Sequence, residues 1–328
     1  MEKILSVSVA AYNVESFIEQ CLDSFIDEEI LDKIEVLVTD DGSTDRTREI
    51  VERYQERYPQ TFRLIRQENA GPGSTVNSGM RHAKGKYFRM VDGDDWVLTE
   101  NMAEYVRFLE DHDVDMVCTN YCCVDHGSGQ KEEHRMEAPR WREVLPFEQV
   151  CGGLHLDMHN VTYRGELLRQ HRIRLDNGFY TDLEYLLLPV PYVETVAFLD
   201  LTVYMYRVSL STQSMNIKSL QRNVAMHEKV LNRLLSEYRG REWKKPVGTY
   251  MLRRIAIMEG MQLSIYLSFG DIKTYRQKTR RMIEEARETS EELYQILCGV
   301  KTFRWLIRSR FILYPLISRM HRKKLGVE

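Results

Sequence analysis

The chain has 328 residues, more than one typical domain, so we expect one sizeable core and a smaller second unit. Apolar residues make up 43% and charged residues 29% of the sequence, which is ordinary for a globular protein, and a net charge of −3 gives no sign of a nucleic-acid partner. Residues 301–328 carry eight Lys and Arg against one acid, whereas residues 1–300 have a net charge of −10. This basic end suggests a negatively charged surface, such as lipid head groups, as a partner.

The cysteines and the N-terminus predict a cytoplasmic protein. The six cysteines are scattered without the C-x-x-C spacing of a metal site, which fits a reducing compartment. The first apolar run is short and becomes polar at Tyr12-Asn13. We therefore expect neither a signal peptide nor a membrane span.

The first 120 residues alternate short β-rich runs with helical stretches. This alternation predicts an α/β fold, in which a mostly parallel sheet is sandwiched by helices through right-handed βαβ units. Ligands bind such sheets beyond the carboxyl ends of the strands. Strands are expected at residues 4–11, 34–39, 62–66, 87–91 and 114–120, with helices at 14–25, from a cap at Ser43 or Thr44 to 57, and at 75–83.

The remaining sequence predicts fewer strands and a helical end. Residues 125–139 are rich in Gly, Glu, Lys and His, which is typical of a mobile loop. Short elements follow and end in a β-like run at 203–207. Helical spacing dominates from residue 216, so we place a boundary near 215 between an α/β domain (1–215) and a helical C-terminal domain (216–328).

Two acidic clusters each follow a predicted strand, at residues 40–45 and 92–95. Carboxylates packed this closely repel one another unless a cation or solvent screens them. Hard divalent cations prefer oxygen ligands and are often shared with substrate phosphates. Each cluster alone is equally well explained by a solvated turn or an acidic first turn of a helix. Together they would meet at the carboxyl edge, one suited to a metal and the other to a base or ribose.

These residues resemble the family 2 glycosyltransferases, which have the GT-A fold. The order and spacing of the motifs agree with the family over the first 95 residues, and the chain departs from it at Ala10, where the family usually has Pro or Thr. That departure affects the shape of the pocket. The matching motifs are Tyr12-Asn13 after the first strand, the turn at 40–45, Asn69-Ala70-Gly71, Asn77-Ser78-Gly79 and the D-x-D motif Asp92-Gly93-Asp94.

The resemblance implies an inverting transfer from a UDP-sugar, assisted by Mn²⁺ or Mg²⁺. Residues 1–95 would be the nucleotide-binding half and residues 96–215 the acceptor-binding half. Tyr12 would stack on the nucleobase, and Asp41 would accept a hydrogen bond from the uracil imide. Asp94 would ligate the metal that bridges the diphosphate, and Asp92 would contact the ribose or the metal.

Four more residues are implied on the donor side. Ala10 and Gly93 lie in the motifs, and Asn69 and Arg81 stand where the family contacts the nucleotide or the donor sugar. A solvated helix face is the alternative for Arg81.

Asp182 is the predicted catalytic base. The stretch 177–185 resembles the family's acidic pair before a helix, with Thr181 in place of the first acid. One carboxylate within reach of the acceptor hydroxyl suits a direct displacement. A helix cap is the alternative role for Asp182, and Glu184 is the alternative base.

The acceptor side is predicted from position in loops. Trp141, His155 and Tyr163 are candidates to line it. His155 and His159 have helical spacing, but the absence of a third ligand nearby argues against a metal pair. Tyr204, Tyr206 and Arg207, followed by Ser211-Thr212, recur in the family, and we expect them to close the site near the diphosphate.

The run 301–324 mixes aromatic and basic residues and predicts an amphipathic helix in a membrane interface, broken or kinked at Pro315. In that case the enzyme would be peripheral on the inner face of the membrane. The alternative is a helix packed on its own domain or on a sister subunit of a homo-oligomer. The aromatic and apolar residues of this run are Phe303, Trp305, Leu306, Phe311 and Leu313.

The expected acceptor is a hydroxyl of a glycan or lipid-linked glycan in cell-surface polysaccharide assembly. Two other functions compete with this one. A nucleotidylyltransferase would carry a Gly-rich, basic loop after the first strand, and residues 11–14 do not have one. A non-catalytic nucleotide-sugar-binding protein of the same fold would not need to keep Asp92, Asp94 and Asp182.

Overall fold

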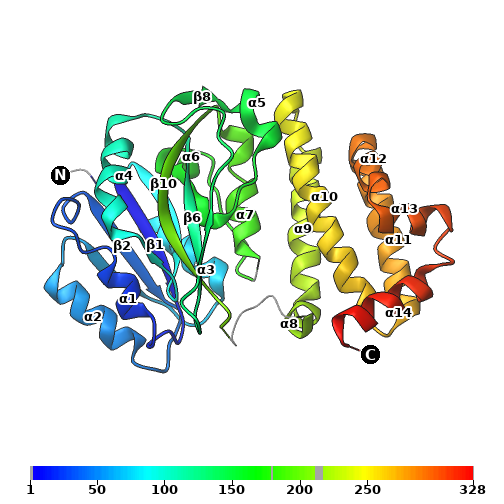
Figure 1. Cartoon of the computed structure of the whole chain (residues 1–328), viewed down its shortest axis with the longest axis horizontal. Helices are drawn as coiled ribbons and strands as arrows, with labels where there is room; N and C mark the ends of the chain where they lie inside the picture. Colours follow the sequence, from blue (N-terminus) through cyan, green and yellow to red (C-terminus); the bar gives the residue numbers. More distant parts are fainter. Residues whose placement is uncertain (1–2, 179, 211–216, 328) are drawn as a thin grey trace. The chain divides into compact units, whose positions relative to one another are not determined.

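The computed structural model describes residues 3–178, 180–210 and 217–327 (Figure 1). The chain divides into two compact units, Met1–Ser211 and Thr212–Glu328. The boundary expected near residue 215 and the pair Ser211-Thr212 lie outside the described residues. Among the described residues, no helix is long and apolar enough to cross a membrane.

The first unit is built on a mixed ten-stranded sheet, which confirms the α/β class. Its main path runs in the order β3-β2-β1-β4-β9-β6-β10-β5, with β7 beside β6 and β8 beside β10. The pairs among β1 to β4 are parallel, as is β6 with β10, whereas β5, β7, β8 and β9 pair in the antiparallel sense. The strands are β1 (Leu5–Ala11), β2 (Ile34–Asp40), β3 (Phe62–Arg66), β4 (Tyr87–Asp92), β5 (Trp96–Val97), β6 (Met116–Asp125), β7 (Lys131–His134), β8 (Val144–Pro146), β9 (Val161–Arg164) and β10 (Thr195–Val208).

Helices cover both faces of this sheet. Figure 1 shows α1 and α2 in front of the strands and α3 behind them. Helix α3 packs closely on β1, because a Cβ on Gly79 would lie 2.0 Å from the Ser8 hydroxyl. The α-helices of this unit are α1 (Ile18–Asp23), α2 (Thr47–Arg57), α3 (Pro72–His82), α4 (Thr99–Asp111), α5 (Phe147–Val150), α6 (Gly165–Gln170) and α7 (Thr181–Leu187), with short 3₁₀ turns at Cys151–Gly153, Met158–Asn160 and Val190–Tyr192.

The prediction of a mobile loop at residues 125–139 is wrong for its first half. Strands β6 and β7 form a hairpin in which Tyr121 pairs with His134. The Asp125 carboxylate accepts hydrogen bonds from the Ser128 backbone and hydroxyl, and Gly129 takes a positive φ of 70°. This Asx-type turn lets polar residues reverse the chain and pair as strands.

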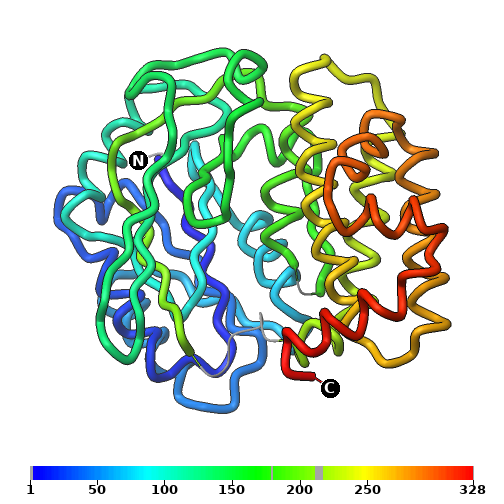
Figure 2. Tube along the Cα trace, turned by 45° about the vertical axis from the view of Figure 1, so that its right-hand side comes forward, coloured from blue at the N-terminus to red at the C-terminus, as the bar shows by residue number. Residues whose placement is uncertain are grey.

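The second unit is helical, as predicted. Its central helix, α10, buries most of its side chains, including Leu252, Ile255 and Leu263, and leaves a stripe with Arg253 and Ile257 exposed. Figure 2 follows the chain from α10 to its red end in α14. The helices are α8 (Ile217–Arg222), α9 (Val224–Arg239), α10 (Lys245–Leu267), α11 (Ile272–Thr289), α12 (Glu291–Gly299), α13 (Lys301–Arg308) and α14 (Tyr314–Leu325).

The run 301–324 is not one interfacial helix. It forms α13 and α14, and the break precedes Pro315, which stands in the first turn of α14, where its missing N–H does no harm. Phe303 and Leu306 are fully buried and Phe311 is nearly so. These three side chains therefore pack on their own unit, as the alternative interpretation expected.

A buried carboxyl in α10 makes the stability of the protein depend on pH. Glu259 is fully buried, and neither of its oxygens has a hydrogen-bond partner among the described residues. Burial, and then the charge of Glu285, raise the pKa of Glu259 to about 8. Between the unfolded pKa near 4.3 and this value, the folded state holds a proton that the unfolded state releases, so stability falls as pH rises.

We expect the free energy of unfolding of the wild-type protein to fall by about 2 kcal/mol more than that of Glu259→Gln between pH 6 and pH 8. Urea unfolding at both pH values measures this difference. Glu288→Gln, on the exposed side of α11, is the matched control and should keep the wild-type slope. An equally steep fall in Glu259→Gln would contradict the assignment.

Candidate active site

Three parallel strands end together at one edge of the sheet and bring the predicted donor residues to one place. Ala11 of β1 pairs with Asp40 of β2, and Ala10 pairs with Asp92 of β4. The residues that follow these strands therefore lie side by side. Tyr12 is half exposed there, Asp41 is nearly buried, and Asp92 and Asp94 are partly buried.

The carboxylates of Asp92, Asp94 and Asp95 form a tight cluster, with ligand atoms within 4.8 Å of one another. Burial, and then the charges of Asp94 and Asp182, raise the pKa of Asp92 to about 7. Burial also raises the pKa of Asp94, which Arg207 partly offsets. The cluster thus concentrates negative charge in a poorly hydrated place, where a cation would relieve the repulsion.

Asp95 fastens the acidic turn to β10. One of its oxygens accepts a hydrogen bond from the Tyr204 hydroxyl at 2.7 Å and the other from the Arg207 backbone N–H at 2.7 Å. The Tyr204 hydroxyl also accepts from the Asp92 N–H at 3.1 Å. Because each Asp95 oxygen already accepts a hydrogen bond in this way, we expect Asp92 and Asp94 to be the main ligands of a metal.

Arg207 holds the same turn from the side. Its Nε donates to the Asp94 carbonyl at 2.8 Å and its Nη2 to Gln20 at 2.7 Å. The guanidinium lies over the rings of Phe17 and Trp96, at 4.9 and 4.7 Å from their centres. Such stacking keeps the planar group in place. The sequence placed Tyr204 and Arg207 near the diphosphate but gave no sign that they bind the turn itself.

Ala10 and Gly93 make the closest approach of the turn to β1. The Gly93 N–H donates to the Ala10 carbonyl at 2.9 Å, and a Cβ on Gly93 would stand 2.7 Å from that oxygen. The position therefore requires glycine. Their predicted contact with the donor remains a prediction, whereas their role in placing Asp92 and Asp94 follows from this geometry.

Asp41 holds the loop that carries Asn69. Its oxygens accept hydrogen bonds from Gln67 Nε2 at 2.7 Å, the Ala70 N–H at 2.9 Å and the Gly71 N–H at 3.0 Å. A uracil imide would have to use the remaining lone pair of Oδ2. Asn69 belongs to this loop, and its side chain is exposed.

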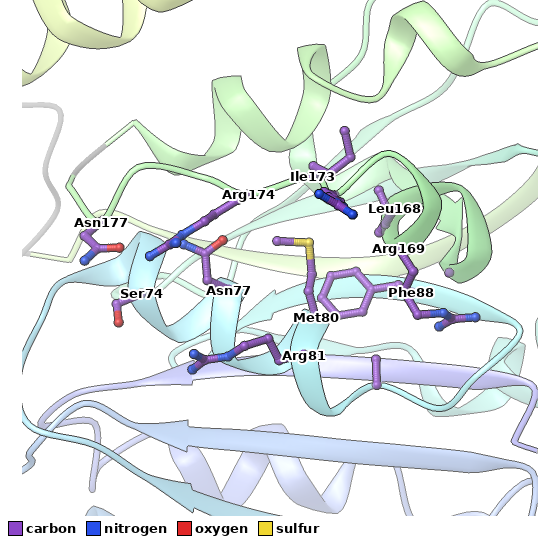
Figure 3. A pocket seen from close by; sticks show the side chains of 13 residues that line it. Ser74, Asn77, Met80, Arg81, Phe88, Leu168, Arg169, Ile173, Arg174 and Asn177 are labelled. Carbon is purple, nitrogen blue, oxygen red and sulfur yellow. The ribbon is translucent and has the colours of Figure 1, made fainter.

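Arg81 does not lie at this edge. Helix α3 begins at Pro72, near Asp41, and Arg81 lies in its last turn, about 14 Å further along the helix axis. Figure 3 shows Arg81 on α3 with Ser74, Asn77 and Met80, among the residues that line a pocket of about 390 Å³ together with Leu168 and Ile173. Arg81 therefore lies away from the strand ends, on an exposed part of α3, and its predicted contact with the donor remains a prediction.

Helix α3 also positions the segment that leads to the predicted base. Asn77 and Leu175 exchange two hydrogen bonds of 2.8 Å, and a Cβ on Gly73 would overlap the Asp176 carbonyl. This contact holds residues 175–177 against the start of α3. Asp182 follows in the first turn of α7, where its charge acts on Asp92.

Glu184 is excluded as the alternative base. It is fully buried, and its carboxylate accepts a hydrogen bond from the Asp176 N–H. A hydroxyl arriving from solvent has no access to it. Asp182, by contrast, is partly exposed.

The predicted acceptor residues are not brought together. Tyr163 is fully buried and donates to the Leu186 carbonyl, so it cannot line an acceptor site. Trp141 is placed by its neighbour Arg142, whose backbone N–H donates to the carbonyl of Phe198 on β10. Phe198 lies about 15–20 Å along this strand from Tyr204. His155 is exposed and lies 3.7 Å from Asp157. The expectation for Tyr163 is thus wrong, and Trp141 lies away from the acidic edge.

A row of stacked rings reaches the acidic cluster instead, and no pattern in the sequence predicted it. Tyr121 stacks on His134 with ring centres 4.6 Å apart, and His159 stacks on Tyr206 at 4.2 Å. Tyr121 and His159 lie 5.1 Å apart and join the two pairs. Burial lowers the pKa of His159 to about 4, so this ring is neutral and packs as an aromatic side chain.

The residues present fit a divalent cation. Asp92 and Asp94 offer carboxylate oxygens, the ligand type that Mn²⁺ and Mg²⁺ prefer. Across the described parts of the chain, no other group brings three His, Cys, Asp or Glu ligands together. His155 and His159 accordingly form no metal pair.

Solved structures of known proteins share this fold. A fragment of S. aureus TarS in complex with UDP-GlcNAc superposes with a TM-score of 0.56 at 20% identity, covering 98% of this chain and 89% of that one. The mannosyltransferase PcManGT of Pyrobaculum calidifontis, in complex with GDP-Man and Mn²⁺, gives 0.55 at 17% identity, covering 98% and 87%. These likenesses identify the GT-A fold that the sequence predicted.

Residues 6–172 match the family described as Glycosyl transferase family 2. The chain belongs to this family and is a glycosyltransferase. Among its relatives is the putative glycosyltransferase EpsH of Bacillus subtilis, 25% identical over 277 residues, which are 77% of this chain and 75% of that protein. The nucleotidylyltransferase and the non-catalytic binding protein are thereby set aside.

The hydroxyl of Tyr204 offers a test of how the acidic turn is held. In Tyr204→Phe the buried Asp95 loses one of its two partners, so we expect a loss of about 1–3 kcal/mol in unfolding free energy and a lower transfer rate. Denaturant unfolding and steady-state kinetics measure the two effects. Tyr58→Phe is the control, because its hydroxyl bonds to no described residue. An unchanged stability in Tyr204→Phe would show that the turn does not depend on this bond.

Proposed function

We propose that this glycosyltransferase moves a sugar from a UDP-sugar to a hydroxyl of a glycan or lipid-linked glycan, with inversion at the anomeric carbon, during assembly of a cell-surface polysaccharide. The observation that carries the proposal is electrostatic. The carboxylates of Asp92, Asp94 and Asp95 cluster within 4.8 Å of one another at the end of β4, and Asp182 is near enough for its charge to raise the pKa of Asp92, so the candidate base lies in the neighbourhood of the candidate metal carboxylates. Donor and acceptor chemistry can therefore meet at the carboxyl edge of the sheet.

The nucleotide would bind over the ends of β1 and β2. Tyr12 is 51% exposed and offers a free aromatic face to a base. Asp41 and the loop it holds, with Asn69, lie beside it. The UDP-GlcNAc in the TarS complex supports uridine as the nucleoside, although the PcManGT complex contains a guanosine donor.

Asp94 and Asp92 would hold Mn²⁺ or Mg²⁺. When bound, the cation neutralises the charge that grows on the departing diphosphate. The Mn²⁺ in the PcManGT complex supports this assignment. Tyr204, Asp95 and Arg207 keep the two carboxylates in place for it.

Asp182 would act as the general base of a single displacement. The acceptor oxygen forms a bond to the anomeric carbon as the bond from that carbon to the diphosphate oxygen breaks. UDP leaves with the bonding electrons, and the proton of the acceptor hydroxyl passes to Asp182. A carboxylate in the first turn of α7, partly exposed beside the acidic cluster, suits this role.

The expectation of an enzyme on the inner face of the membrane stays part of the proposal. Lipid-linked acceptors are held at a membrane, and the basic residues of 301–328 would attract the enzyme to anionic lipids.

Asp182→Asn separates catalysis from donor binding. We expect kcat to fall by at least about 10²-fold, because the base is lost, while UDP with Mn²⁺ still raises the melting temperature as in the wild-type protein. A UDP-release assay and thermal unfolding measure the two. Asp111→Asn, at the exposed end of α4, is the matched control. Wild-type turnover in Asp182→Asn would remove the base assignment.

Asp94→Asn, unlike Asp182→Asn, should weaken the binding of the donor nucleotide itself. A ligand at 100 times its Kd stabilises the folded state by about 2.7 kcal/mol. We expect the Mn²⁺-dependent part of the UDP stabilisation to disappear in Asp94→Asn, together with transfer. If Mn²⁺ still enhanced UDP binding to this variant, the metal would have other ligands.

A further inference from the structure

The C-terminal unit contains a second cavity that the transfer reaction does not use. It has a volume of about 610 Å³, within the usual range of roughly 300–1,000 Å³ for small-ligand sites. Its wall is formed by α10, α13, α14 and the residues just before α13 and α14. The lining is mostly apolar and includes Leu263, Leu267, Phe303, Trp305, Leu316, Ile317 and Met320.

Apolar side chains around this cavity are unusually exposed. Ten large hydrophobic side chains are exposed among the described residues, and five of them lie between residues 300 and 320. Trp305, Leu316 and Met320 are 53%, 57% and 65% exposed, and all three line the cavity. An exposed apolar patch beside a hollow marks a surface that contacts another apolar phase or molecule.

The same cavity is bordered by positive charge only. Lys301 and Lys324 line it, no acid does, and neither lysine forms an ion pair with a described residue. His321 Nε2 lies 3.0 Å from the Ser264 hydroxyl, so these two polar groups of the wall are paired with each other. The basic residues of 301–328 surround this rim in the sequence. An occupant therefore has a long apolar part and a negatively charged head.

We propose that this cavity binds one hydrocarbon chain of an anionic membrane phospholipid, with the lipid phosphate at Lys301 and Lys324 and the exposed rim of α13 and α14 in the bilayer interface. The sequence predicted that apolar residues of one continuous helix would insert into the membrane interface, but Phe303 and Leu306 are buried within the unit. In our proposal the lipid chain in the cavity provides the apolar contact instead. One inserted chain gives only weak, reversible binding, and a basic patch supplies the second attraction. The proposal is independent of the transfer chemistry at the acidic edge.

Vesicle flotation with the full chain tests the surface. We expect at least tenfold more protein on phosphatidylglycerol vesicles than on phosphatidylcholine vesicles, falling at least tenfold in Leu316→Glu and Met320→Glu. Ile257→Glu is the matched control, because Ile257 is 60% exposed on α10 and does not line the cavity. Equal binding to both lipids, or an equal loss in Ile257→Glu, would overturn the proposal. So would a homodimer, seen by light scattering, that Leu316→Glu dissociates without any vesicle binding.

A second variant tests the cavity apart from the surface. A Cβ on Gly260 would meet no atom within 4 Å, so the side chain of Gly260→Leu enters the cavity without changing any charge. Brominated phosphatidylglycerol should quench wild-type tryptophan fluorescence. Most of this quenching should disappear in Trp305→Phe, and it should fall at least threefold in Gly260→Leu. Full quenching in Gly260→Leu would mean that no chain enters the cavity.

Sugar transfer to a soluble acceptor provides the remaining control. It should be unchanged in Leu316→Glu and Gly260→Leu, because neither residue lies in the first unit. Failure of the lipid proposal therefore leaves the transfer proposal standing, and the reverse also holds.

Discussion

The attachment of the acidic turn to β10 is the interaction on which the rest of the site depends. Asp95 accepts hydrogen bonds from the Tyr204 hydroxyl and the Arg207 N–H, and Tyr204 in turn accepts from the Asp92 N–H. Without these bonds, three adjacent carboxylates would turn toward solvent to escape one another. Asp95 thus has a structural role, and in our proposal Asp92 and Asp94 are the carboxylates that bind the cation.

This arrangement also unites the two halves of the first unit. The turn follows β4, which belongs to the parallel strands β1 to β4, whereas Tyr204 and Arg207 come from β10, more than 100 residues later. On the other side, the bonds between Asn77 and Leu175 tie α3 to the segment before Asp182. In the proposed reaction, a donor bound over the early strands would meet a base supplied by the later part of the unit.

Short-range sequence patterns predicted those parts of the fold that depend on neighbouring residues in the chain. The βα alternation of the first 95 residues and the acidic ends of β2 and β4 were legible, because buried strands and polar strand ends leave a mark in the sequence. Contacts between residues far apart in the chain left no such mark in the sequence. The role of Asp95, the stack of His159 on Tyr206 and the distance of Arg81 from the donor edge each depend on partners far away in the chain. The prediction that Tyr163 lines the acceptor side failed for the same reason, because the sequence around a buried core aromatic residue does not differ from that around one in a pocket.

The central claim is that Asp94 and Asp92 hold a divalent cation against the donor diphosphate while Asp95 does not. The most direct measurement is the anomalous scattering of Mn²⁺ in a crystal of the protein grown with UDP and Mn²⁺. The account predicts one peak at the carboxyl edge within about 2–2.3 Å of an Asp94 carboxylate oxygen, in contact with the diphosphate, with Asp95 still bonded to Tyr204. UDP bound at this edge without a metal peak, or a metal ligated by Asp95 in place of Asp94, would contradict it.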